Sequence, residues 1–190
     1  MLTLTDIQPA DLFETPPSAW FTKEITRLQE AKGFHWGMFV APQSLIATES
    51  IEKGTALTRY EYATSYIYRI KALQNVSTGD ILCAIADYGR STYGMSENFL
   101  TAFNYLVNYW LPQYPWEGPP VPSFLPGWPG TPDIDKSFTK PLNAPVNCIQ
   151  YIVLIAHRLG YDILLPGQLV IQKNLENSPY LEYLGVLEID

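Results

Sequence analysis

Apolar positions along the chain recur with two spacings, which predict a mixture of helices and short strands. In the first sixty residues, Phe21, Ile25 and Leu28 are spaced i, i+4 and i+7 and predict one apolar stripe of a helix. The hydroxyl and proline residues at 15–18 are typical of a helix start, and Gly33 is typical of a helix end.

β-Branched and aromatic residues, in places alternating with polar ones, predict strands around and after this helix. The predicted strands are residues 36–40, 44–48, 55–62, 66–70 and 169–171, with a weak edge strand in the tail at 180–190. The mixed order of helices and strands predicts an α+β fold.

Three more helices are expected in the second half of the chain. The first is capped by Asp80 and stopped by Gly89, the second covers residues 96–112, and the third is capped by Asn147 and stopped by Gly160. The inward-facing residues are Ile81, Ala84, Ile85 and Tyr88 in the first helix, and Ile149, Ile152, Val153, Ala156 and Leu159 in the third.

A proline-rich segment separates the second of these helices from the third. Ten of the sixteen prolines lie at residues 112–145, together with several aromatic side chains. Proline at this density prevents helix and central strand and favours extended backbone. Disordered linkers are poor in aromatics. We therefore expect an extended arm that lies on its own domain or on a neighbouring subunit.

An ordered set of short motifs in the chain resembles LysM modules, which are small βααβ units. After the strand at 66–70, the motif residues are Gly79, Asp80, Ile81, Ile85, Ala86, Tyr88, Gly89, Leu100, Asn104, Leu106, Pro166, Gly167 and Gln168. In this interpretation, Gly79 permits a tight turn, Asp80 caps a helix, and Gly167 turns the chain into the last strand. About sixty residues separate the two parts of the motif, an insertion as long as the module itself.

The resemblance implies a division of the chain into three parts. A LysM-like domain is expected at residues 63–175, interrupted by the proline-rich arm at 112–145. An N-terminal extension with a helix and short strands precedes it at 1–62, and a C-terminal tail follows it at 176–190.

The resemblance also implies two alternative functions. LysM modules of contractile-tailed phages and related injection machines are assembly domains of baseplate proteins. The chain would then be a baseplate-like structural protein of the virion, assembled in the host cytoplasm, that docks onto other subunits. Other LysM modules bind peptidoglycan or chitin, in a groove here expected between residues 79–82 and 162–165. Candidate contact residues for a partner are Tyr109, Trp110, Tyr114, Trp116, Phe124 and Trp128.

Composition narrows the choice of partners. The net charge is −7, with 12 basic and 19 acidic residues, so nucleic acid is a poor expectation. The charged fraction is 16%, below the roughly 25% usual for soluble domains. Low charge is compatible either with surfaces covered by partners or with a large aromatic core. The N-terminus lacks the pattern of a signal peptide, and no apolar run is long enough for a membrane span. A cytoplasmic location is therefore the alternative to the virion.

Catalytic motifs are not apparent, which favours a non-enzymatic protein without cofactor or metal. His157 is expected at a helix end, facing the negative helix terminus. Carboxylates such as Glu14 and Glu176 are expected on solvated faces. Cys83 and Cys148 lie in apolar runs and are expected to be small buried side chains, with a disulfide between them possible but not implied.

Overall fold

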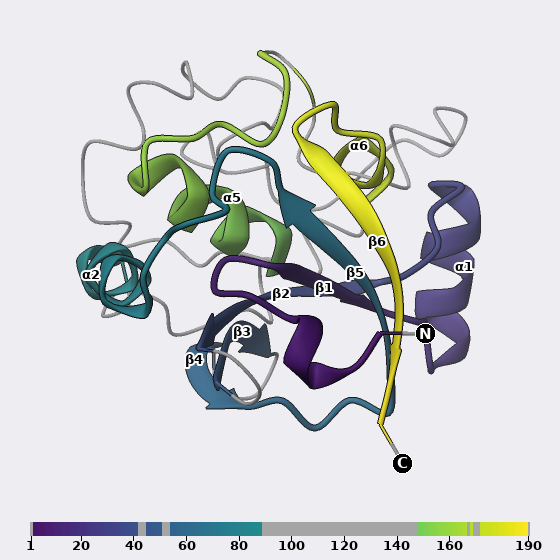
Figure 1. Ribbon diagram of the computed structural model, residues 1–190. Helices are drawn as coiled ribbons and strands as arrows, with labels where there is room; N and C mark the ends of the chain where they lie inside the picture. Colours follow the sequence, from purple (N-terminus) through teal and green to yellow (C-terminus); the bar gives the residue numbers. More distant parts are fainter. Residues whose placement is uncertain are drawn as a thin grey trace.

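A six-stranded antiparallel sheet forms the centre of the protein (Figure 1). The computed structural model describes residues 2–41, 45–50, 54–88, 148–166, 168 and 172–189. The strands follow the order β4-β3-β2-β1-β5-β6 across the sheet. Their bounds are β1 Leu12–Thr15, β2 His35–Ala41, β3 Leu45–Ser50, β4 Gly54–Arg59, β5 Thr64–Ile70 and β6 Leu181–Glu188. The predicted α+β class is confirmed.

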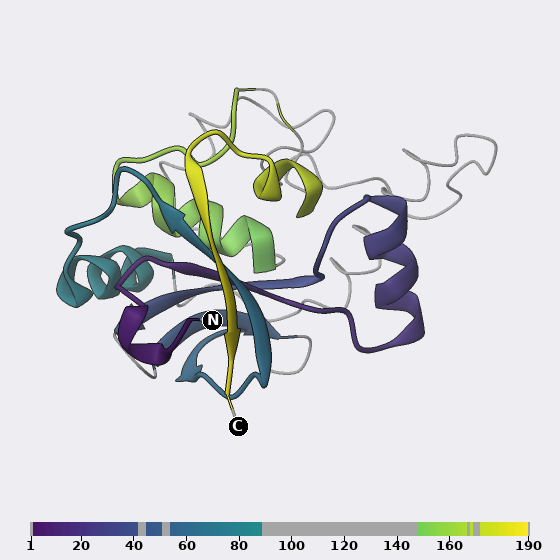
Figure 2. The same ribbon diagram turned by 45° about the vertical axis from the view of Figure 1, so that its right-hand side comes forward.

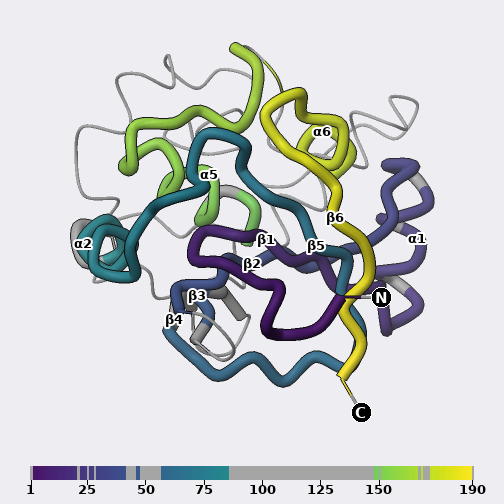
Figure 3. The backbone as a smooth tube through the Cα atoms, viewed as in Figure 1, coloured from purple at the N-terminus to yellow at the C-terminus, as the bar shows by residue number. Residues whose placement is uncertain are grey.

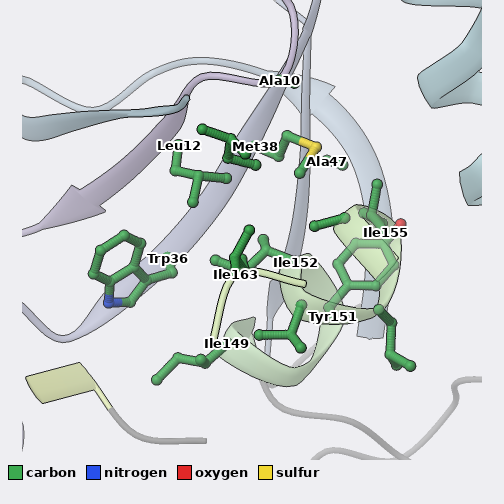
Figure 4. Close-up of a cluster of buried hydrophobic side chains, with 14 of the residues drawn as sticks. Ala10, Leu12, Trp36, Met38, Ala47, Ile149, Tyr151, Ile152, Ile155 and Ile163 are labelled. Carbon is green, nitrogen blue, oxygen red and sulfur yellow. The ribbon is translucent and has the colours of Figure 1, made fainter. Parts of the chain in front are cut away.

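Two helices cover one face of this sheet. α2 spans Thr78–Tyr88 and α5 spans Cys148–Arg158; α5 packs against β2, β3 and α2. Figure 4 shows Leu12, Trp36 and Met38 from the strands on one side of this core, facing Ile152 of α5. Each large apolar side chain removed from water contributes about 1.5–3 kcal/mol to folding. This face therefore holds most of the hydrophobic stabilisation.

The opposite face carries a smaller, aromatic core. Phe13 lies edge-on to Phe39 and Tyr60, with ring centroids 5.5 and 5.4 Å away. Ile7, which follows the short 3-10 helix η1 (Leu4–Asp6), covers this side. A Cβ on Gly37 would lie 2.3 Å from the Phe13 ring, so the close fit of β1 and β2 requires glycine there.

The remaining helices lie around the sheet rather than on its centre. α1 (Trp20–Leu28) stands at the end of the sheet away from α2 in both views (Figures 1 and 2). The short helix α6 (Gln172–Glu176) precedes β6. The two ends of the chain run side by side (Figure 3), where the Leu2 amide donates to the Val186 carbonyl at 3.0 Å.

The sheet joins the three parts that the sequence predicts as separate. β1 to β4 come from residues 1–62, β5 from residues 63–175, and β6 from residues 176–190. The predicted boundaries therefore do not separate structural units. The N-terminal residues supply most of the sheet, and the predicted tail supplies a full edge strand.

The strand at 66–70, with which the LysM-like motif begins, is part of β5. Here, β5 is paired with β1 on one side and with β6 on the other. Both edges of β5 are therefore occupied by strands from outside the motif. Residues 169–171 lie outside the described residues, as do the predicted helix at 96–112 and the proline-rich arm at 112–145.

Two predicted helix ends differ from the structure. α1 ends at Leu28, and the chain turns at Glu30 with a positive φ of 51°, before Gly33 is reached. α2 is capped by Ser77 rather than by Asp80: the Asp80 amide donates to Ser77 Oγ, and the Ser77 amide donates to Asp80 Oδ2, both at 3.2 Å. This reciprocal pair is a capping box. Gly79 is thus a residue of the first helical turn, not of a tight turn.

Candidate functional site

A groove of about 760 Å³ lies where β5 passes into α2. Its walls are the loop at residues 71–76, the first turns of α2 and the end of α5 with Tyr161. A second hollow of about 350 Å³ shares Lys71, Ala72 and Tyr161 with it and continues to Tyr180. The two hollows therefore form one continuous concave surface.

Local sequence signals position both walls of the groove. The Ser77–Asp80 capping box fixes the start of α2, and Asp80 itself lines the groove. On the other wall, α5 ends at Gly160, whose φ of +90° is readily adopted only by glycine. The Gly160 amide donates to the His157 carbonyl and the Tyr161 amide to the Ala156 carbonyl, at 2.9 and 3.0 Å. This Schellman ending directs Tyr161 into the groove.

Charged groups at the groove are held by the protein itself. Lys71 Nζ donates to the Pro179 carbonyl at 2.7 Å, and the Lys71 amide donates to the Tyr180 carbonyl at 3.0 Å. The pKa of Asp80 is lowered by its hydrogen bonds with Ser77, which keep the carboxylate ionised. Tyr161 and Tyr180, each 39% exposed, are the aromatic surface that the groove offers.

Cys83 also lines the groove, contrary to the expectation that it is buried. α2 turns Ile81, Ala84 and Ile85 toward the core, and Cys83 lies on the opposite side of the helix. Cys148 is buried, and the two cysteines are not joined by a disulfide. The side chain of Leu82 is 36% exposed and lies on the same solvent-facing side of α2 as Cys83.

The described residues bring part of the LysM-like motif to this region. Gly79 and Asp80 are in the first turn of α2. Ile81 and Ile85 lie on the buried side of the same helix, as expected. Gln168 belongs to a turn: its amide donates to the Leu165 carbonyl at 3.1 Å, and its side chain accepts from the Leu165 amide at 3.0 Å. Pro166 is exposed within this turn.

The other predicted contact residues are not placed. The side chains of Ala86 and Tyr88, and all of Gly89, Leu100, Asn104, Leu106 and Gly167, lie outside the described residues. The same holds for the aromatic candidates Tyr109, Trp110, Tyr114, Trp116, Phe124 and Trp128. They remain predictions.

The two histidines occupy different settings. His157, in the last turn of α5, contacts Asp162 through Nδ1 at 2.6 Å. Its position at the helix end agrees with the expected interaction with the helix terminus. The His35 ring packs beside Phe13 and Tyr62, and burial lowers its pKa to about 4. His35 is therefore neutral at physiological pH.

A second polar cluster lies at the far end of the sheet, beneath α6. Glu14 of β1 is completely buried, which corrects its expected position on a solvated face. Its Oε1 accepts from the Gly33 amide at 3.0 Å, and its Oε2 accepts from the Tyr68 hydroxyl at 3.2 Å. Glu176 of α6, which is half-buried, accepts from the Lys32 amide at 2.6 Å and shares a hydrogen bond with Glu14.

This cluster contains a protonated carboxyl group at neutral pH. Burial, followed by the charge and hydrogen bond of Glu176, raises the pKa of Glu14 to about 9. A carboxyl–carboxylate hydrogen bond requires one proton between the two groups. The pair therefore carries one negative charge rather than two.

Two buried donors near this end lack a hydrogen-bond acceptor among the described residues. They are Trp36 Nε1 and Gln29 Nε2, both on completely buried side chains. In Figure 4 the Trp36 nitrogen is turned away from Leu12 and Met38. An unsatisfied buried donor costs roughly 1–3 kcal/mol. Hydrogen bonding of buried donors is therefore less complete at this end of the core than at its centre.

The burial of Glu14 was difficult to predict from the sequence. Glu14 stands between Phe13 and Thr15, in a segment too short to show periodicity, so a solvated carboxylate was the natural expectation. The glycine at position 33 is related to this burial, because a Cβ there would lie 2.3 Å from Glu14 Cγ. The sequence alone does not connect these positions.

Comparisons with known proteins do not assign the chain. No known family model matches it, and no curated protein matches its sequence significantly. Within the described ranges, no group of three or more histidine, cysteine or acidic side chains is arranged to hold a metal ion. Among the helices described, none has the length and apolar character needed to cross a bilayer.

Proposed function

We propose that the protein is a structural component of a phage tail or tail-like contractile assembly, and that it docks onto a neighbouring subunit through the groove beside α2. One observation carries this proposal. The groove presents Tyr161 and Tyr180 to solvent, while its lysine and aspartate have structural hydrogen bonds of their own. Half-exposed tyrosines beside satisfied charges are typical of protein contact sites.

The shape of the groove supports docking of a chain segment. Its two hollows adjoin along Lys71, Ala72 and Tyr161, which forms a continuous channel between α2 and the turn before β6. An extended arm of a neighbouring subunit could lie in such a channel. The proline-rich residues 112–145 would give each copy of the chain an arm of this kind.

The proposal is tested in particles from the organism that carries the gene. Antibody against the chain should label one end of tail-like particles in electron micrographs. A deletion strain should regain assembled particles with the wild-type gene and with Tyr183→Ala, but not with Tyr161→Ala/Tyr180→Ala. Tyr183 is the matched control, because it is a 45% exposed tyrosine that does not line the groove. Labelling only of soluble protein would reject the proposal.

A second function is favoured by the position of the groove. The LysM resemblance places a glycan groove between residues 79–82 and 162–165, and Asp80 and Asp162 line the two hollows here. Tyrosines at a groove rim can stack on sugar rings. The alternative is therefore recognition of N-acetylglucosamine polymers in peptidoglycan or chitin.

Titration calorimetry with chito-oligosaccharides distinguishes the two functions. Glycan recognition requires heat of binding at millimolar ligand that Tyr161→Ala abolishes and Tyr183→Ala preserves. Absence of heat with the wild-type protein would remove this alternative and leave the assembly function.

A further inference from the structure

α6 is fastened to the turn between α1 and β2 mainly by polar contacts. The Gln172 amide donates to Gln29 Oε1, and Gln172 Nε2 donates to the Phe34 carbonyl, both at 3.0 Å. Lys173 forms an ion pair with Glu30 at the surface. Leu175 supplies the completely buried apolar side chain of this five-residue helix. So short a helix depends on its contacts, because it cannot be stable by itself.

Two adjacent peptide groups bring the acidic pair together across this interface. The Lys32 amide binds Glu176 of α6 at 2.6 Å, and the next amide, that of Gly33, binds Glu14 of β1 at 3.0 Å. Neighbouring amides are only a few ångströms apart, so the two carboxyl groups are held close together. This geometry tolerates one negative charge and opposes two.

Among the described residues, the groups around the pair supply no positive charge that would compensate a second carboxylate. From β5, the Tyr68 hydroxyl donates to Glu14 at 3.2 Å, and from β6 the Tyr183 ring packs on Tyr68. Lys32 contributes its backbone amide to the pair, whereas its Nζ lies over the Tyr183 ring, 4.2 Å from the centroid. Both phenols are neutral at physiological pH, since their pKa values are raised by burial.

We propose that α6 is a latch that stays closed only while Glu14 and Glu176 share a proton, and that loss of this proton to solvent releases α6. Glu176 is half-buried, so the pair can exchange its proton with water. Gln29 Nε2 and Trp36 Nε1, which have no acceptor among the described residues, raise the free energy of the closed state and so favour opening. Local unfolding of this kind occurs in the least stable parts of a fold.

The latch is connected to the groove through a short turn. Ser178 Oγ donates to the Ile163 carbonyl at 2.6 Å, and Tyr180, which lines the groove, follows α6 by four residues. Release of α6 therefore loosens the chain that carries one rim tyrosine. The proposal concerns α6 itself and does not depend on what the groove binds.

The protein provides its own reporter, because Lys173 lies inside α6. Trypsin cuts after lysine, and a helical bond is cut only when it opens. The rate of cleavage after Lys173 is measured on the full chain at pH 6.5 and pH 9 for wild type, Glu14→Gln, Glu176→Gln and Glu182→Gln. Comparing variants at one pH cancels the pH dependence of the protease. Glu182, an exposed residue of β6, is the matched control.

At pH 9, we expect cleavage after Lys173 to be at least about tenfold faster in wild type and Glu182→Gln than in Glu14→Gln or Glu176→Gln. At pH 6.5, the cleavage rates of the four proteins should lie closer together than at pH 9, because the cost of the shared proton grows with pH. Equal rates at pH 9 would overturn the proposal. So would cleavage after Lys173 that occurs only together with cleavage after Arg59 and Lys71, because the pair would then govern global unfolding rather than a latch.

Discussion

Replacing Glu14 by glutamine should stabilise the protein, although it changes a completely buried, hydrogen-bonded side chain. Glutamine has nearly the same shape as the protonated carboxyl group. Its oxygen can still accept from the Gly33 amide and its NH2 group can donate to Glu176, but the NH2 group cannot accept from the Tyr68 hydroxyl. The lost Tyr68 bond gives an effect that does not depend on pH, so the pH-dependent part of the change in stability is expected to come from proton linkage.

The sign of the effect follows from the direction of the shift. The pKa of Glu14 is raised from 4.5 to about 9 in the folded protein, so the folded state keeps a proton that the unfolded chain releases. The contribution of Glu14 to the free energy of unfolding is complete below pH 4.5 and is lost as the pH rises toward 9. Each pH unit in this window lowers the free energy of unfolding by about 1.4 kcal/mol. At pH 7, the accumulated loss is about 3 kcal/mol.

Urea unfolding at pH 4.5, 6, 7 and 8 measures this loss directly. Between pH 4.5 and pH 7, the free energy of unfolding of Glu14→Gln should rise by about 3 kcal/mol relative to that of the wild type. Glu182→Gln, an exposed change on β6, should follow the wild type. Parallel profiles for wild type and Glu14→Gln would refute the reasoning, because they would mean that Glu14 titrates normally in the folded state.

Three further substitutions test other parts of the fold. Gly37→Ala should lower the free energy of unfolding by about 3 kcal/mol in urea titrations, because its Cβ would lie 2.3 Å from the Phe13 ring. Ser77→Ala should cost about 1 kcal/mol by removing one half of the capping box with Asp80, and its thermal midpoint should fall accordingly. Asp11→Ala should cost about 3 kcal/mol in chemical denaturation, because it leaves a half-buried arginine without its bidentate carboxylate.

Elements with a clear local pattern were predictable from the sequence. Strands β2 to β5 follow runs of β-branched and aromatic residues, and α2 and α5 bury the apolar stripes that the 3.6-residue period indicates. Gly160 ends α5 as predicted, since only glycine readily adopts its backbone angle. The weak strand in the tail is confirmed as β6, at the edge of the sheet.

Elements defined by distant contacts were not predictable. β1 has four residues, and its place between β2 and β5 depends on pairing with both. Because the sequence does not reveal this central place, it also does not reveal that Glu14 is buried. α6 is too short to show a helical period, and its contacts are to residues more than 130 positions away.

The groove illustrates how a partial prediction arises. The resemblance to LysM modules implies a groove between residues 79–82 and 162–165, and Asp80 and Asp162 each line one of the two hollows. The sequence did not reveal Tyr180 at the rim, which the pairing of β6 with β5 brings there.

One physical connection follows from this arrangement. β6 begins at Leu181, directly after the groove residue Tyr180, and is preceded by α6, whose position depends on the acidic pair. The groove and the acidic pair lie at different ends of the sheet but are joined by eight residues of chain, from Gln172 to Pro179. Any ligand that holds Tyr180 in place must also favour a closed α6, and by reciprocity a closed α6 must favour that ligand. A partner bound in the groove should therefore slow the cleavage after Lys173 at pH 9.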